Sequence, residues 1–95
     1  MQTNERLSSE LITELNSFTD SFLSDCDNTL EKKTIELIAT AVSICVNCGP
    51  CTDFHISEAR KYGATSKEIN KVFKIVMAVS AGKIKVFSRG LRNDF

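Results

Sequence analysis

The chain has 95 residues, a formal net charge of zero and 42% hydrophobic residues. This length predicts one domain over residues 1–95, and a domain so small buries little of its surface alone, so we expect a homo-oligomer. The longest uncharged apolar run, residues 37–46, is about half of the roughly 20 residues that a membrane-spanning helix needs. The stretch MQTNERLSSE at the start lacks the apolar core of a signal peptide. We therefore expect a soluble, cytoplasmic protein with no membrane partner.

The neutral total hides an uneven distribution of charge. Residues 1–31 contain seven acidic side chains and one basic, whereas residues 60–92 contain nine basic side chains and one acidic. We interpret the two halves as complementary faces that meet within or between subunits. Because no basic motif is interleaved with aromatic residues, we expect no nucleic-acid partner.

The first half of the chain has the sequence pattern of two helices. Apolar side chains at Leu11, Leu15, Phe18 and Phe22 form one stripe and predict a helix over residues 5–23. A second helix is predicted to begin near residue 30 with Thr29 as its cap, and to be buried because it is apolar over most of its circumference.

Two further helices carry clear end signals. Pro50 is tolerated only in the first turn of a helix, so the third helix should begin at the CxxC sequence and end before Gly63 in a left-handed conformation. Thr65 and Glu68 form a capping-box pattern that starts the fourth helix, and Gly82 is predicted to end or bend it before a short last helix. No strand pattern occurs, so the fold class expected is all-α with about five helices.

Residues 34–52 contain a single charged side chain, Glu36, and lead directly into the sequence CGPCTDFH at residues 48–55. A carboxylate is costly to bury without a partner, which suggests that Glu36 has a specific purpose. Cys48 near the helix N-cap and Cys51 one turn later would both be favoured as thiolates by the helix N-terminus. His55 lies one turn after Cys51 and faces inward, where Glu36 is the candidate to orient its ring.

Other interpretations of the cysteines remain open. The tetrapeptide CGPC occurs in thioredoxin, but there it follows a strand, so no thioredoxin fold is inferred. Cys45, Cys48, Cys51 and His55 also have the spacing of a metal or cluster site, although Cys45 should belong to the preceding helix. Our leading hypothesis therefore involves no metal, and Cys45 and Cys26 are expected to be inert thiols.

The spacing of Glu36, Cys48, Cys51 and His55, followed by the stretch KYGATSKEI, resembles the alkylhydroperoxidase D-like, carboxymuconolactone decarboxylase superfamily over about residues 30–82. The resemblance implies an all-α fold assembled as dimers, trimers or hexamers. It also implies that the two thiols, as a redox-active disulfide without another cofactor, reduce a hydroperoxide or a protein disulfide and are recharged by a dithiol donor. Glu36 and His55 would form the proton relay of this catalytic site.

The chain departs from the family pattern in two places. Peroxidase members often carry a histidine between the cysteines, where this chain has Gly49 and Pro50. It also resembles a single-repeat version of longer, two-repeat members, which implies that copies must pair to complete a site. Lactone decarboxylase members lack the CxxC, so the cysteines argue against that branch. The alternatives are a metal-binding or purely structural helical oligomer, or a lyase of the decarboxylase type with His55 as acid or base. Proximity to His55 favours Cys51 as the attacking thiolate, while exposure at the N-cap favours Cys48.

Overall fold

The computed structural model describes residues 6–90 and contains four helices in this range. Their bounds are α1 Ser9–Leu23, α2 Lys32–Cys45, α3 Gly49–Lys61 and α4 Ser66–Ser88. No strand occurs among these residues, which confirms the all-α fold class.

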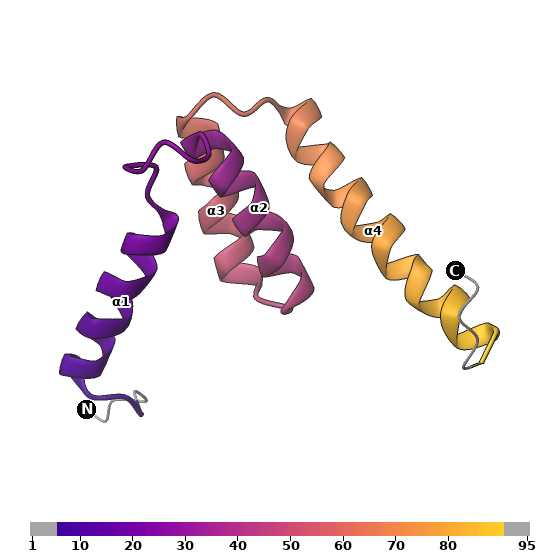
Figure 1. Cartoon of the computed structure of the whole chain (residues 1–95), viewed down its shortest axis with the longest axis horizontal. Coiled ribbons are helices and arrows are strands. Elements are labelled where there is room, and N and C mark those ends of the chain that lie inside the picture. Colours follow the sequence, from indigo (N-terminus) through magenta and orange to yellow (C-terminus); the bar gives the residue numbers. More distant parts are fainter. Residues whose placement is uncertain (1–5, 91–95) are drawn as a thin grey trace.

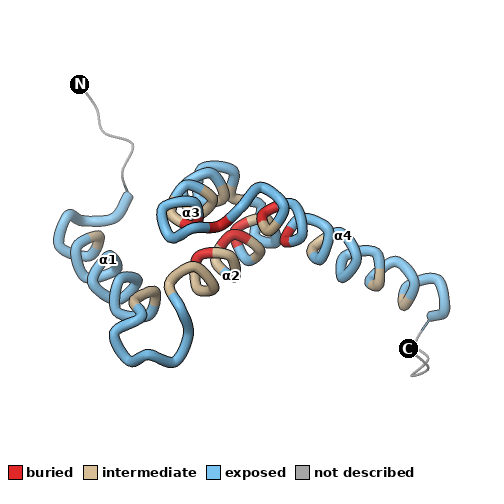
Figure 2. Tube along the Cα trace, turned by 90° about the horizontal axis from the view of Figure 1, so that it is seen from above, coloured by how far each residue is buried: buried red, intermediate tan, exposed pale blue. Residues whose placement is uncertain are grey.

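The helices form a central pair with two projecting arms (Figure 1). α2 and α3 lie side by side, α4 packs on α2 through its first half, and α1 contacts α2 only at its C-terminal end. The radius of gyration is 17.1 Å, whereas a compact domain of this length would have about 12 Å. The chain is therefore extended, with most of both arms exposed (Figure 2).

The face that α2 buries is polar. Its buried side chains are Glu36, Thr40 and Ser43, one stripe at helical spacing, while Ile38 and Val42 are about half exposed, at 49% and 54%. Thr40 and Ser43 satisfy their hydroxyls by donating to the carbonyls of Glu36 and Ala39, both at 2.8 Å. The prediction that α2 is buried because of its apolar side chains is thus wrong for this chain alone, because the polar stripe faces α3.

The apolar core is small and lies where α2, α3 and the start of α4 meet (Figure 2). Ala59, Ala64 and Ile69 are its buried members, with Leu37 and Ile56 packed against them. Two of these positions carry small side chains, Ala59 on α3 and Ala64 in the loop that follows it. This core fixes α2, α3 and the first turns of α4, and nothing comparable fixes α1, which has no buried residue.

The predicted ends of α3 and α4 are confirmed. Gly63 has φ of +95°, and the N–H groups of Gly63 and Ala64 donate to the carbonyls of Arg60 and Ala59 at 3.0 and 2.9 Å. This is the Schellman arrangement, in which a residue without Cβ adopts the left-handed conformation at low cost. Thr65 and Glu68 form a complete capping box at the start of α4.

Two predicted boundaries are wrong. Thr29 does not cap α2: the helix begins after Glu31, which makes no capping hydrogen bond, and the N–H of Thr29 is bound by Asp27 instead. Gly82 does not interrupt α4, which runs unbroken to Ser88, so the described residues contain four helices rather than about five. A single glycine costs a helix only about 1 kcal/mol relative to alanine, and neither proline nor a second glycine is present to stop α4 there.

No helix in residues 6–90 is long and apolar enough to cross a bilayer.

The capping box predicts a pH dependence of stability. The backbone N–H of Thr65 and then the ammonium of Lys33 hold the pKa of Glu68 below its ordinary value. The folded state therefore favours the ionised carboxylate, so this stabilisation is complete above the ordinary pKa of a glutamate and is lost as the pH falls through the lowered value. Urea unfolding from neutral pH to pH 3 should show that Glu68→Gln is less stable than wild type at neutral pH, with the difference shrinking on acidification. A difference independent of pH would contradict this assignment.

Candidate functional site

The turn between α2 and α3 places Cys48 at the N-cap of α3. Asn47 has φ of +60°, a conformation that asparagine tolerates better than most residues, and it turns the chain sharply after α2. The N–H of Cys48 then donates to the carbonyl of Ser43 at 3.0 Å, and its own carbonyl accepts from the Thr52 hydroxyl at 2.8 Å. Hydrogen bonds thereby join the N-cap residue to both α2 and α3.

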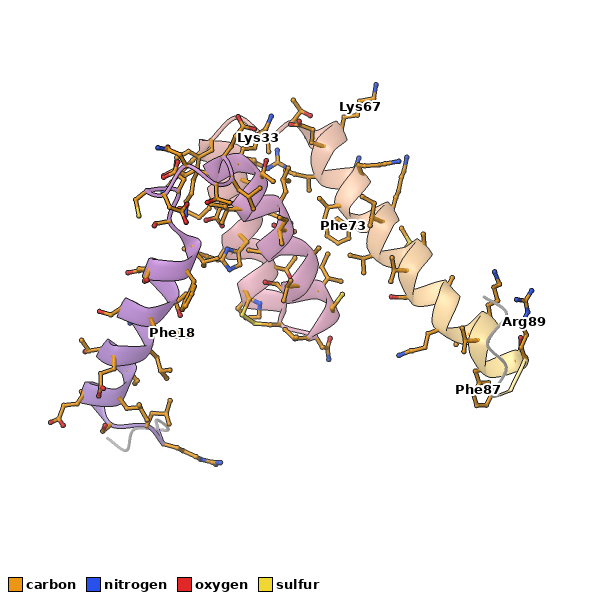
Figure 3. All side chains as sticks on the ribbon, viewed as in Figure 1. Phe18, Lys33, Lys67, Phe73, Phe87 and Arg89 are labelled. Atoms are coloured by element: carbon orange, nitrogen blue, oxygen red, sulfur yellow. A yellow bond between two sulfur atoms is a disulfide. The ribbon has the colours of Figure 1, made fainter. Side chains whose placement is uncertain are left out.

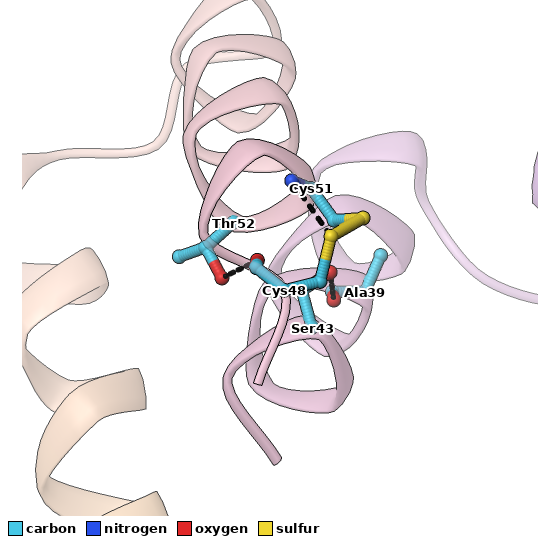
Figure 4. Close-up of a disulfide and its surroundings, with 5 residues drawn as sticks. All are labelled: Ala39, Ser43, Cys48, Cys51 and Thr52. Atoms are coloured by element: carbon cyan, nitrogen blue, oxygen red, sulfur yellow. Dashed lines mark hydrogen bonds between the residues drawn. A yellow bond between two sulfur atoms is a disulfide. The ribbon is translucent and has the colours of Figure 1, made fainter. Parts of the chain in front are cut away.

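Cys48 and Cys51 are joined by a disulfide, as Figure 4 shows, with 5.2 Å between their Cα atoms. The N–H of Cys51 points at Cys48 Sγ across 3.2 Å. This N–H belongs to the first turn of α3, whose free N–H groups favour negative charge. Sulfur at position 48 is consequently the one that the helix N-terminus stabilises as a thiolate.

The two cysteines differ in accessibility. Cys51 is exposed whereas Cys48 is half-buried, which contradicts the expectation that its N-cap position makes Cys48 the more exposed sulfur. Cys48 is hydrogen-bonded to residues of both α2 and α3, while Cys51, one turn later, is exposed. A molecule approaching from solvent therefore reaches Cys51 more readily.

Glu36 is the buried charge at the centre of the site. It is 2% exposed, and its Oε1 lies 2.7 Å from His55 Nδ1. The predicted contact between Glu36 of α2 and His55 of α3 is therefore present. An ionised carboxylate can only accept, so Nδ1 carries the shared hydrogen and the lone pair of the neutral ring lies on Nε2. The contact thereby orients the ring of His55 and leaves Nε2 on the side away from Glu36.

Lys32 also contacts Glu36, although the sequence did not identify it as a residue of the site. Its Nζ lies 2.8 Å from Glu36 Oε2 and donates to the carbonyl of Leu23, the last residue of α1, at 2.6 Å. Burial lowers the pKa of Lys32, but the hydrogen bond and the charge of Glu36 outweigh this and raise the pKa above its usual value. The i, i+4 spacing from Lys32 to Glu36 was a usable signal, since such residues adjoin on a helix.

His55 faces a cleft rather than the disulfide. Among residues 6–90 it forms no hydrogen bond with either sulfur, although it follows Cys51 by one turn on α3. It lines a cleft of about 380 Å³ whose walls come from α1, the following loop and the apolar side of α2. The lining residues are Phe22, Leu23, Leu30, Ile35, Ile38, Ala39, Val42, Ser43 and His55. The one histidine of the chain thus meets a largely apolar cleft beside the disulfide helix.

The remaining cysteines do not join this site. Cys45 and Cys26 are free thiols, and both are exposed. Within the described range, no three histidine, cysteine or acidic side chains are grouped as metal ligands.

The sequence profile of the carboxymuconolactone decarboxylase family matches residues 12–89, which is most of the chain and includes Glu36, both cysteines of the disulfide and His55. The chain belongs to this family. Its all-α fold agrees with the resemblance carried by the CxxC spacing.

Three curated relatives show where the similarity lies. Two are named alkyl hydroperoxide reductase AhpD: the protein from Hyphomonas neptunium is 42% identical over 55% of this chain and 29% of its own length, and that from Maricaulis maris is 36% identical over 55% and 30%. The uncharacterized protein 4 in the cox locus of Paracoccus denitrificans is 34% identical over 70% of this chain and 64% of its length. The chain therefore spans less than a third of the two AhpD proteins. No solved structure matches the chain.

The Lys32 contact generates a stability prediction. Lys32→Met leaves the buried Glu36 with one partner, and we expect a loss of about 2 kcal/mol in the free energy of unfolding. Lys33→Met is the matched control, because Lys33 pairs with the more exposed Glu68 and should cost much less. Adding Glu36→Gln to Lys32→Met should recover part of the loss, as measured by urea unfolding at neutral pH. Equal losses in the two lysine variants would contradict the pairing.

Proposed function

We propose that this chain is a thiol–disulfide oxidoreductase that reduces hydroperoxides, or a protein disulfide, through Cys48 and Cys51. The observation that carries the proposal is the buried, ion-paired Glu36, which contacts His55 one turn along α3 from a disulfide at the helix N-terminus. The names of the two AhpD relatives support the same activity. A reducible disulfide suits the cytoplasm, where dithiol donors are abundant. No other cofactor is required by this chemistry.

The different exposure of the two cysteines supports different roles for them. In the reduced protein, Cys51 attacks because it is the exposed cysteine and has His55 one turn away. Cys48 resolves, since it is the half-buried residue, its sulfur adjoins that of Cys51, and the N–H of Cys51 would stabilise its thiolate. When a dithiol donor later attacks the disulfide at Cys51, the same N–H favours Cys48 as the leaving thiolate.

The reaction then balances in three steps. The Cys51 thiol loses its proton to His55 through an intervening water, because the ring faces the cleft and does not contact the sulfur. The sulfur then bonds to one peroxide oxygen, the O–O bond breaks, and the departing alkoxide takes the proton as an alcohol. The product is a sulfenic acid on Cys51. The thiol of Cys48 attacks this sulfur, the S–O bond breaks, and water leaves as the disulfide forms. An external dithiol restores both thiols and becomes a disulfide. Glu36 stabilises the positive charge on His55 during the first step.

A peroxide-reduction assay with dithiol donors tests the proposal. We expect Cys51→Ser to abolish turnover, and Glu36→Gln and His55→Asn to lower it about 10²-fold, which is the usual worth of a positioned proton-transfer group. Cys45→Ser is the matched control and should retain wild-type turnover. Full activity in Cys51→Ser would refute the proposal. Lactone decarboxylation that survives loss of both site cysteines would favour the lyase alternative, in which His55 acts as acid or base.

Alkylation of the reduced protein tests the order of the two thiols. With limiting iodoacetamide, Cys51 should be modified faster than Cys48, because the reagent reaches the more exposed sulfur first. Peptide mass spectrometry measures both rates, and exposed Cys26 and Cys45 supply internal references for thiols away from the helix N-terminus. Faster modification of Cys48 would reverse the assignment.

A further inference from the structure

The carboxylate of Glu36 contacts two basic side chains, one at each oxygen. Lys32 Nζ lies 2.8 Å from Oε2, and His55 Nδ1 lies 2.7 Å from Oε1. The side chains of Lys32 and His55 are only 18% and 15% exposed, so water and salt screen the three groups poorly. A single negative charge therefore lies between two groups that it favours as cations.

A carboxylate and an imidazole without a third charge make a poor base. The anion favours the imidazolium, and a ring that carries both protons has no lone pair to accept another. In the proposed reaction, His55 receives the proton of the Cys51 thiol through water, so its ring has to be neutral before this step. A positive charge on the other side of Glu36 opposes the imidazolium and would keep the ring ready.

The structure favours a charged Lys32 at this position. Burial lowers the pKa of its ammonium group, but the hydrogen bond and the charge of Glu36 raise this pKa above its usual value, with further contributions from Tyr62 and Glu58. The ammonium also donates to the carbonyl of Leu23 at 2.6 Å. Leu23 ends α1, and the C-terminus of a helix favours positive charge. Lys32 therefore keeps its charge over the pH range in which an imidazole titrates.

Few other charges act on the ring of His55. The cleft that it lines contains no other titratable side chain, and Glu36 is its one ion-pair partner among residues 6–90. On its own helix, the carboxylate of Glu58 pairs with Lys61 at 2.9 Å. The ring thus responds to Glu36 and, across the shared carboxylate, to Lys32.

We propose that Lys32 is a positioning residue of the proton relay, whose positive charge at the far oxygen of Glu36 keeps the imidazole of His55 neutral and able to accept a proton. Because Lys32 also binds the last carbonyl of α1, the end of this helix holds the charge in place. The catalytic consequence rests on the proposed function, whereas the effect of Lys32 on the charge of His55 stands without it.

Proton NMR of the oxidised protein tests the effect on charge directly. His55 is the one histidine of the sequence, so its ring signals are unambiguous, and the disulfide keeps the two site thiols from titrating. Lys32→Met should raise the pH at which the ring is half protonated by about one unit, because loss of a nearby positive charge favours the imidazolium. Lys32→Gln, which keeps a hydrogen-bond donor but not the charge, should raise it equally. Lys32→Arg restores the charge and should restore the wild-type titration.

Lys33→Met is the matched control. Lys33 follows Lys32 at the start of α2 (Figure 3), but its Nζ pairs with Glu68 at 3.1 Å rather than with Glu36. This pair is more exposed, so its charge is better screened from the site. His55 should therefore titrate in Lys33→Met as it does in wild type.

The pH profile of peroxide reduction tests the catalytic consequence. The acid limb of kcat/KM should move to higher pH by the same interval in Lys32→Met, with activity recovering above it, and Lys32→Arg should restore the wild-type profile. A purely structural lysine would lower activity alike at every pH and leave the limb in place, which would overturn the catalytic role.

The NMR titration separates this role from the redox proposal. An unchanged or lowered titration of His55 in Lys32→Met and Lys32→Gln would overturn the inference, and so would an equal rise in Lys33→Met. A rise in Met but not in Gln would also overturn it, because the hydrogen bond rather than the charge would then be responsible. A wild-type chain that reduces no peroxide, with the expected rise present in both neutral variants, would instead refute the redox proposal alone.

Discussion

The buried carboxylate of Glu36 is the constraint around which this molecule is organised. At 2% exposure it would be prohibitively costly to ionise without partners, and its two oxygens are bound separately, one by Lys32 and one by His55. Lys32 also binds the last carbonyl of α1, so a single charge network ties together α1, α2 and α3. The same contacts that offset the desolvation of Glu36 hold the imidazole of His55 in one orientation, one turn after Cys51 on α3.

This constraint explains the unusual orientation of α2. The helix turns Glu36, Thr40 and Ser43 toward α3, which leaves Ile38 and Val42 on the opposite side in the single chain. Thr40 and Ser43 bury their hydroxyls at little cost, because each donates to a carbonyl of its own helix. Because α2 turns its polar side chains toward α3, the buried side of this helix is polar and its outward side is apolar. The apolar outward side of α2 and the position of the Glu36–His55 contact therefore have a common origin.

The N-terminus of α3 makes the two cysteines unequal. Cys48 is held at the N-cap by bonds to both neighbouring helices and receives the N–H of Cys51, while Cys51 remains open to solvent. The sulfur of Cys48 thus accepts an N–H group of the helix, and Cys51 is the more exposed residue. This difference suits the proposed chemistry, in which a dithiol attacks the disulfide at Cys51 and Cys48 leaves.

The sequence by itself determined the features that depend on neighbours along the chain. The Schellman end at Gly63, the capping box of Thr65 and Glu68, and the placement of Cys48 at the start of α3 each involve residues no more than five positions apart, so local rules suffice. The contact between Glu36 and His55 could also be anticipated, because the isolated carboxylate and the histidine lie on two helices joined by a short turn. The tertiary structure alone decided which face of α2 is buried, that Cys51 rather than Cys48 is exposed, and that α4 continues through Gly82. It also decided that Lys32 spans from Glu36 to the end of α1. These outcomes balance desolvation and packing between segments distant in the chain, and a helical periodicity that is apolar on nearly every side does not specify that balance.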